Sequence, residues 1–330
     1  MTQAGPFPVG VTTLVFTKPS VTTGAPRPLV TDIWYPAKPG TGTSESLGRR
    51  DAKVLRRHWP LVIFSHGNCD LADTSSFLTK ALASWGFVVA GPAHFGDTPS
   101  DGLAVCFSPS TEVDSFLNRP ADVSFTIDSM LAEAANPSSR FAARLNAKRI
   151  GGAGWSFGGL TTILVAQQEP RVRAALSLAG GAAAFIKTGG ITIATMVQGG
   201  ELDTIVPFPL EQAAYTLLGG PRFLVEILNI GHSAFADMCA EQIPPDCPPN
   251  CPPCPPDCSP ALPPCIAGSI TQDEAHRLVE RFAVPFFLRY LGHQKLFGRL
   301  LTQDRVAGVV VQAQPRRPSS PSGAFLNENE

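Results

Sequence analysis

The sequence predicts an α/β fold in which a mostly parallel sheet carries helices on both faces. Between residues 61 and 230, short apolar segments typical of buried strands alternate with segments of helical periodicity. Because crossovers between parallel strands are right-handed, this alternation places helices on both sides of the sheet. A chain of 330 residues that is 44% hydrophobic is also long enough to enclose a large core.

The expected elements follow one another in a regular order. Two β-rich segments come first, and the polar segment 41–58 after them is expected to be a loop. The first helix is expected to start at Asp73 or Thr74, either of which could cap it, and the last helix is capped by Thr271. The expected strands are 7–16, 29–37, 61–64, 87–93, 149–154, 173–180, 191–200 and 221–230, and the expected helices are 73–85, 121–134, 158–168, 209–220 and 271–291.

We expect one domain over residues 1–310, with a Cys/Pro-rich insertion at 239–265 and a flexible tail at 311–330. The prolines of the insertion exclude helix, and its cysteines form either disulfides or a zinc site. Disulfides are favoured because only one CxxC pair is present, and they favour an exported protein. Six of the eight cysteines belong to this insertion: Cys239, Cys247, Cys251, Cys254, Cys258 and Cys265.

The overall charge and hydropathy exclude several kinds of partner. With 26 basic and 27 acidic residues, the chain has a formal charge of −1 and no electrostatic footprint for nucleic acid. No apolar run reaches the roughly 18 residues that would span a bilayer, and the opening MTQAGPFPVG does not resemble a signal peptide. We therefore expect neither a nucleic-acid partner nor a membrane span.

The glycine-rich stretch GGAGWSFGGL, residues 151–160, can be compared with three known motifs. A dinucleotide-binding GxGxxG would need a third glycine where Phe157 stands, and a phosphate-binding P-loop would need a lysine that is absent. The pattern GxSxG does match, with Ser156 at its centre, after an expected strand and before an expected helix. This pattern is typical of a nucleophile elbow, and the alternative is a helix-capping serine in an ordinary turn.

A nucleophilic serine needs a base and an orienting acid, which in this architecture follow it in the order acid, then histidine. Asp203 and His232 both lie just after expected parallel strands, so both can reach Ser156 at the carboxyl edge of the sheet. His232 would accept the serine proton, and Asp203 would fix the imidazole tautomer. Glu201 is the rival acid.

The remaining site residues flank these three. The backbone N–H groups of Phe157 and Asn68 are the expected oxyanion-hole donors. Gly67 and Trp155 are expected to border the substrate, and His66 to have a supporting role. Hydrolysis by such a site requires no metal, and no cofactor-binding loop is visible.

In combination, the motifs DIWYP, VIFSHGN, LASWGFVVAGPAHFGDT, RPADVSFTIDSML, GWSFGG, GELDTIVP and GHSAF give a specific resemblance over residues 30–235. The sequence resembles the α/β-hydrolase superfamily, in the branch of dienelactone hydrolase-like, platelet-activating-factor acetylhydrolase-like and cutinase-like polyester hydrolases. The resemblance implies serine esterase chemistry by Ser156, Asp203 and His232. The chain has Asn68 where polyester hydrolases usually carry an aromatic residue, and no tryptophan after the strand that follows the elbow.

The expected substrate is a small to medium acyl ester, which includes lipid acetyl esters and aliphatic or aromatic polyesters. The same three residues would also serve an amidase, a thioesterase or an acyltransferase. A non-catalytic protein that binds a partner through the Cys/Pro-rich insertion is a further alternative. The insertion follows His232 closely, so it is expected to border the site as a rigid lid. Cys69 and Cys106 either form a disulfide or are buried thiols.

Overall fold

The computed structural model describes residues 4–237, 270–302 and 306–315. The strands are β1 (Val9–Pro19), β2 (Pro26–Pro36), β3 (Thr43–Glu45), β4 (Gly48–Arg50), β5 (Trp59–Ser65), β6 (Val88–Pro92), β7 (Leu145–Trp155), β8 (Val172–Leu178), β9 (Ala194–Gly200), β10 (Arg222–Ile227) and β11 (Val309–Gln314). The helices are α1 (Ser76–Ser84), α2 (Leu103–Cys106), α3 (Pro109–Ala135), α4 (Phe157–Gln168), α5 (Phe208–Leu217) and α7 (Gln272–Tyr290).

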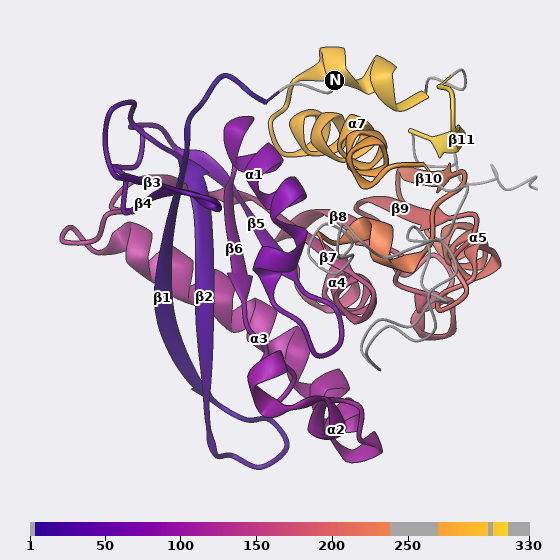
Figure 1. Ribbon diagram of the computed structural model, residues 1–330, viewed down its shortest axis with the longest axis horizontal. Coiled ribbons are helices and arrows are strands. Elements are labelled where there is room, and N and C mark those ends of the chain that lie inside the picture. Colours follow the sequence, from indigo (N-terminus) through magenta and orange to yellow (C-terminus); the bar gives the residue numbers. More distant parts are fainter. Residues whose placement is uncertain (1–3, 238–269, 303–305, 316–330) are drawn as a thin grey trace, which may run out of the picture.

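All the described strands belong to one sheet, in the order β11-β10-β9-β8-β7-β5-β6-β2-β1-β4-β3 (Figure 1). The central strands from β10 to β6 are parallel to one another. The outer strands β11 and β2 join this group antiparallel to their neighbours. The predicted α/β class with a mostly parallel sheet is therefore confirmed.

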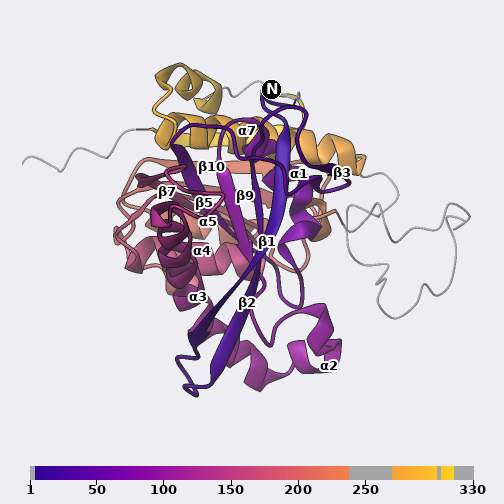
Figure 2. The same cartoon turned by 90° about the vertical axis from the view of Figure 1, so that its left-hand side faces the viewer.

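Helices cover both faces of the sheet (Figures 1 and 2). Helices α1 and α7 pack on one face, where the aromatic residues Phe282, Phe286 and Phe287 of α7 are fully buried. On the other face, α3 buries Val123 and Ile127 against the sheet, next to α4 and α5. Because the central strands are parallel, their carboxyl ends lie along one edge of the sheet. In the part of the chain that is described, no helix combines the length and apolarity needed to cross a membrane.

Two expected helix starts have different outcomes. The hydroxyl of Thr271 accepts a hydrogen bond from the N–H of Glu274, as predicted for an N-cap of α7. The expected cap of α1 is wrong, because residues 72–75 form a 3₁₀ turn and α1 begins only after Ser75. The hydroxyl of Thr74 donates instead to the carboxylate of Asp70 at 2.7 Å.

The sequence underestimated the regular structure in three places. Residues 41–58, expected to be a loop, contain the hairpin of β3 and β4. The helix expected at 121–134 begins at Pro109, because Ser108 caps it and proline is tolerated in the first turn of a helix. Residues 311–314 of the expected tail pair with β10 as part of β11. The rest of that tail from residue 316, and the insertion at 239–265, lie outside the described residues.

A disulfide between Cys69 and Cys106 decides the alternative that the sequence left open. Both cysteines are buried. Cys69 belongs to the loop after β5, and Cys106 ends α2, so the disulfide joins that loop to a segment 37 residues further along the chain.

Replacing both cysteines by alanine should lower the free energy of unfolding by about 2–4 kcal/mol, because a cross-link over a loop of this length restricts the unfolded chain. Guanidinium denaturation under non-reducing conditions measures the change. Reductant should shift the midpoint of the wild type further than it shifts that of the variant, because only the wild type has the Cys69–Cys106 cross-link to lose. Equal midpoints for the two proteins without reductant would contradict the prediction.

Candidate active site

Ser156 occupies a strained turn between β7 and α4. Its backbone has φ 56° and ψ −122°, a conformation that residues with a side chain rarely adopt. The flanking glycines make the turn possible: a Cβ on Gly154 would lie 2.2 Å from the carbonyl oxygen of Gly158, and one on Gly158 would lie 1.9 Å from that of Ser65. The GxSxG spacing is therefore a steric requirement of this turn.

The structure brings Ser156, His232 and Asp203 into one chain of hydrogen bonds. The Oγ of Ser156 lies 2.8 Å from Nε2 of His232, and Nδ1 of His232 lies 2.8 Å from Oδ2 of Asp203. Because a carboxylate only accepts, Nδ1 carries the proton, and Nε2 accepts from the serine hydroxyl. The other oxygen of Asp203 accepts from the N–H groups of Ile205 and Val206, at 2.9 and 2.8 Å, which fixes the carboxylate.

The rival acid Glu201 is not part of this chain. Its carboxylate accepts a hydrogen bond from the backbone N–H of Asn229, 3.0 Å away, and its side chain is exposed. Only Asp203 of the two acids contacts the imidazole.

Trp155, expected to border the substrate, lies against His232, with the ring centroids 5.3 Å apart. Its side chain is only 5% exposed, and its indole N–H donates to the carbonyl oxygen of His232 at 3.1 Å. It also packs against Gly67, where a Cβ would come within 2.9 Å of the tryptophan ring. Trp155 and Gly67 thus pack against each other, and Trp155 supports His232 through its hydrogen bond.

The two expected oxyanion-hole donors belong to Phe157, next to Ser156 in the chain, and to Asn68 in the loop after β5. Phe157 is the first residue of α4, so its N–H has no acceptor within the helix. The backbone N–H of Asn68 bonds to no other group of the described residues. The dipole of α4 adds partial positive charge at the same point. Both N–H groups are therefore available to an oxygen held near the serine.

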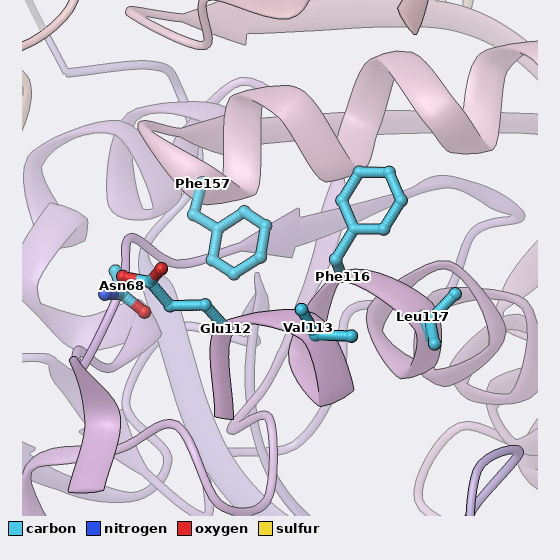
Figure 3. Close-up of a pocket in the computed structure, with 6 residues that line it drawn as sticks. All are labelled: Asn68, Glu112, Val113, Phe116, Leu117 and Phe157. Carbon is cyan, nitrogen blue, oxygen red and sulfur yellow. The ribbon is translucent and has the colours of Figure 1, made fainter. Parts of the chain in front are cut away.

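An apolar groove of about 430 Å³ opens beside these donors (Figure 3). In the figure, the ring of Phe157 faces the side chains of α3 across the groove. The polar groups lie at the end formed by Asn68 and Glu112, and the other end is apolar. The groove is lined by Asn68, Glu112, Val113, Phe116, Leu117 and Phe157.

Sequence reasoning missed the aromatic residues of this region. The rings of Phe116 and Phe185 lie 5.1 Å apart, and Phe185 follows β8 at the site where polyester hydrolases were expected to carry a tryptophan. The segment AGGAAAF after that strand contained the signal, because it ends in an aromatic residue. The sequence around Phe116 contained no such signal, because the residues before 121 were expected to form a loop.

A second Ser–His–Asp chain lies nearby and is buried. The Oγ of Ser65 is 2.8 Å from Nε2 of His94, and Nδ1 of His94 is 3.0 Å from Oδ2 of Asp122. All three residues are at most 1% exposed. Burial lowers the pKa of His94 to about 4, with the nearby positive charge of Arg119 as the next cause. This imidazole is a poor base at neutral pH.

His66 has the supporting role that its position suggested. Its Nε2 accepts from the backbone N–H of His94 at 3.0 Å, so its Nδ1 carries the proton and donates to the carbonyl oxygen of Gly67 at 2.7 Å. Burial holds the pKa of His66 well below its usual value, which keeps the ring neutral. His66 therefore stiffens the loop that carries Asn68.

The carboxyl group of Glu211 is completely buried behind the site. It accepts a hydrogen bond from the N–H of Gly181 at 2.7 Å. Its pKa is raised to about 7, mainly by burial, with the negative charge of Asp203 as a smaller contribution in the same direction. Glu211 is accordingly near its midpoint of titration at neutral pH.

Across the described residues, no group of three or more His, Cys, Asp or Glu side chains is arranged to hold a metal ion. The predicted Cys/Pro-rich lid, with its disulfides or zinc, falls on residues 238–269, outside the described part of the chain.

Comparisons with known proteins agree with this architecture. A family profile described as PET hydrolase-like matches residues 66–235. Cutinase est2 of Thermobifida alba is 27% identical over 182 residues, 51% of this chain and 54% of the relative. Cutinase est1 of the same organism is 29% identical over 147 residues, 44% of this chain and 43% of the relative. The chain thus spans about half the length of the curated relatives it matches.

The structure of a ferulic acid esterase from Streptomyces cinnamoneus superposes with a TM-score of 0.72 at 22% identity. The match covers 94% of this chain and 97% of that one. This similarity confirms the α/β-hydrolase fold.

The Glu211→Gln variant should change how stability depends on pH. Because the folded-state pKa of Glu211 is raised to about 7 from the usual 4.5, wild-type folding loses stability as the pH rises from about 4.5 through 7. Glutamine keeps the acceptor for Gly181 and cannot ionise. Between pH 5 and pH 8, the free energy of unfolding of the variant should therefore rise relative to that of the wild type by on the order of 2–3 kcal/mol.

Denaturant unfolding of both proteins at each pH measures this difference, and subtraction removes the other groups that titrate in the same range. A stability difference that stays constant with pH would show that Glu211 is not the titrating group.

Proposed function

Because the chain belongs to the PET hydrolase-like family, we propose that it is a serine carboxylic ester hydrolase with Ser156, His232 and Asp203 as its catalytic triad. The observation that carries the proposal is the unbroken chain of hydrogen bonds from Ser156 through His232 to Asp203. The strained backbone of Ser156 supports it, since strain of this kind recurs at catalytic residues.

In the first half of the proposed reaction, the Oγ of Ser156 attacks the ester carbonyl carbon while Nε2 of His232 takes its proton. The carbonyl oxygen becomes an oxyanion, which accepts hydrogen bonds from the N–H groups of Phe157 and Asn68. Asp203 stabilises the charged imidazole. The tetrahedral intermediate then collapses, His232 gives the proton to the leaving alkoxy oxygen, and the alcohol departs from an acyl-enzyme.

In the second half, water replaces the alcohol. His232 takes a proton from the water, whose oxygen attacks the acyl carbon and forms a second oxyanion in the same hole. Collapse of this intermediate returns the proton to Oγ of Ser156 and releases the carboxylic acid. Neither half needs a metal or a cofactor.

The groove beside the oxyanion donors supports an ester whose acyl part is apolar. Val113, Phe116 and Leu117 supply one wall, and the ring of Phe157 supplies the other (Figure 3). A flat or flexible apolar group can bury surface there, while its carbonyl stays next to Asn68 and Ser156. The related cutinases, the ferulic acid esterase and the PET hydrolase-like family support the same class, which includes aliphatic and aromatic polyesters.

Ser156→Ala should lower kcat for p-nitrophenyl butyrate by about 10⁶, because removal of the nucleophile disables the whole triad. It should also abolish labelling by a fluorophosphonate, as followed by intact mass. Ser65, which belongs to the buried second chain, should stay unlabelled in both proteins. Label on Ser65, or turnover by the alanine variant close to that of the wild type, would overturn the assignment of Ser156 as the nucleophile. A wild-type chain with neither labelling nor turnover would leave a binding protein as the better interpretation.

Leu117→Asp should raise KM for p-nitrophenyl octanoate by about tenfold, since a charge in the groove opposes burial of a long acyl chain. It should leave KM for p-nitrophenyl acetate nearly unchanged. Leu296→Asp is the matched control, because Leu296 is an exposed leucine outside the groove. Steady-state kinetics over a series of acyl lengths measures both. Equal effects of the two variants would show that the groove does not bind the acyl chain.

A further inference from the structure

We propose that Arg119 is a positioning residue that holds the oxyanion hole in shape. This inference rests on the proposed ester hydrolysis and extends it beyond the triad. Arg119 lies in the middle of α3, and its side chain is completely buried. A single guanidinium contacts both walls of the hole, the loop that carries Asn68 and the ring of Phe157.

The contacts with the first wall fix the direction of the Asn68 N–H. Nη1 of Arg119 donates to the carbonyl oxygen of His66 at 2.6 Å, and Nη2 donates to that of Gly67 at 2.8 Å. The Gly67 carbonyl and the Asn68 N–H belong to one planar trans peptide, so they point in opposite directions. A guanidinium that holds the carbonyl therefore aims the N–H away from itself. Polarisation of the peptide also strengthens that N–H as a donor.

Asp97 completes the support of this loop. Its Oδ2 accepts from Nε and Nη2 of Arg119, at 3.0 and 2.6 Å, and its Oδ1 accepts from the N–H of Cys69 at 2.7 Å. The carboxylate also neutralises the buried guanidinium, which is otherwise costly to bury. As a result, the carbonyls of His66 and Gly67 and the N–H of Cys69 are all bonded, while the N–H of Asn68 is left for the ester oxygen.

The contact with the second wall is a cation–π interaction. The guanidinium carbon of Arg119 lies 4.4 Å from the centroid of the Phe157 ring. That ring is turned toward α3 in Figure 3, on the side opposite its backbone attachment to α4. Since the N–H of Phe157 is the other donor of the hole, one cation fixes the positions of both donors.

Only arginine has the shape for this arrangement. Its planar guanidinium presents several N–H groups in fixed directions and a flat face that stacks on an aromatic ring, whereas the ammonium of lysine is a compact point charge. Arg119→Lys thus keeps the positive charge and removes the geometry. If the residue acted by charge alone, lysine would preserve the activity.

Arg27 offers a matched control. It is 2% exposed, and its Nε donates to both oxygens of Asp122, at 2.9 and 3.0 Å. Arg27 and Arg119 are therefore both buried arginines paired with a buried aspartate. No contact of Arg27 reaches residues 66–69 or Phe157.

The experiment compares Arg119→Lys with Arg27→Lys. Both should lower the denaturation midpoint. For p-nitrophenyl butyrate, Arg119→Lys should lower kcat about 10- to 100-fold and change KM less than about threefold, because the misplaced donors stabilise the transition state less. Arg27→Lys should change kcat less than about threefold. Measurements are made at a temperature where both variants are folded by circular dichroism.

The affinity for a boronic acid, which forms a tetrahedral adduct with the serine, separates positioning from general loss of stability. Its inhibition constant should rise in Arg119→Lys by about the same factor as kcat falls. A folded Arg119→Lys variant with wild-type kcat and boronate affinity would overturn the inference, as would equal kcat losses in both lysine variants. If Arg119→Lys does not fold, Asp97→Asn takes its place, because asparagine keeps the shape of the side chain and the acceptor for Cys69. This variant should lower kcat with KM unchanged. A wild-type kcat in Asp97→Asn would overturn the inference.

Measurements on the wild type distinguish a failure of this inference from a failure of the proposed function. If the wild-type chain neither hydrolyses the ester nor reacts with a fluorophosphonate, the proposed function is wrong. If it does both and the Arg119 variant matches it, only the positioning role fails.

Discussion

There is room for only a hydrogen atom between the α-carbon of Gly158 and the carbonyl oxygen of Ser65. A Cβ at that position would lie 1.9 Å from the oxygen. This close approach presses the first turn of α4 against the end of β5, and the rest of the site depends on it. Ser156 has its positive φ in the turn just before this contact, and the loop that leads to Asn68 lies against the start of α4, whose first residue is Phe157. A nucleophile and two donors thus meet because two backbones touch.

The two Ser–His–Asp chains show that environment rather than residue type decides the chemistry. In the buried chain, Asp122 pairs with Arg27 and Lys18, and His94 has a pKa of about 4. The carboxylate is thus already neutralised, and the imidazole does not accept a proton at neutral pH. Among the described residues, Asp203 instead receives only the two backbone N–H groups and the imidazole of His232, so its charge is available to stabilise an imidazolium. Ser156 is also partly exposed, whereas Ser65 is buried.

The parts of this molecule that follow a local pattern could be predicted from the sequence. The order of central strands and helices follows hydrophobic periodicity, and the elbow follows from two glycines at fixed spacing. Asp203 and His232 could be chosen because parallel strands end at one edge of the sheet. The sequence could not give the contacts of Arg119, since the loop after β5, the carboxylate of Asp97 and α3 meet only in the folded chain. The hydrogen bond from Trp155 to the carbonyl of His232 could not be predicted for the same reason, because it joins residues 77 positions apart.

The start of α3 was missed for a physical reason that also bears on function. Prolines at 109 and 120 and exposed apolar side chains are typical of loops, yet residues 109–135 form one helix. Pro120 has no N–H to donate to the carbonyl of Phe116, which weakens α3 between the turns that line the groove and Arg119. The turns before it line the groove with Val113 and Phe116, and Arg119 beside it is fixed by Asp97 and the loop carbonyls. The hydrogen bond that α3 lacks therefore lies between the residues that line the groove and the arginine that fixes α3 to the loop after β5.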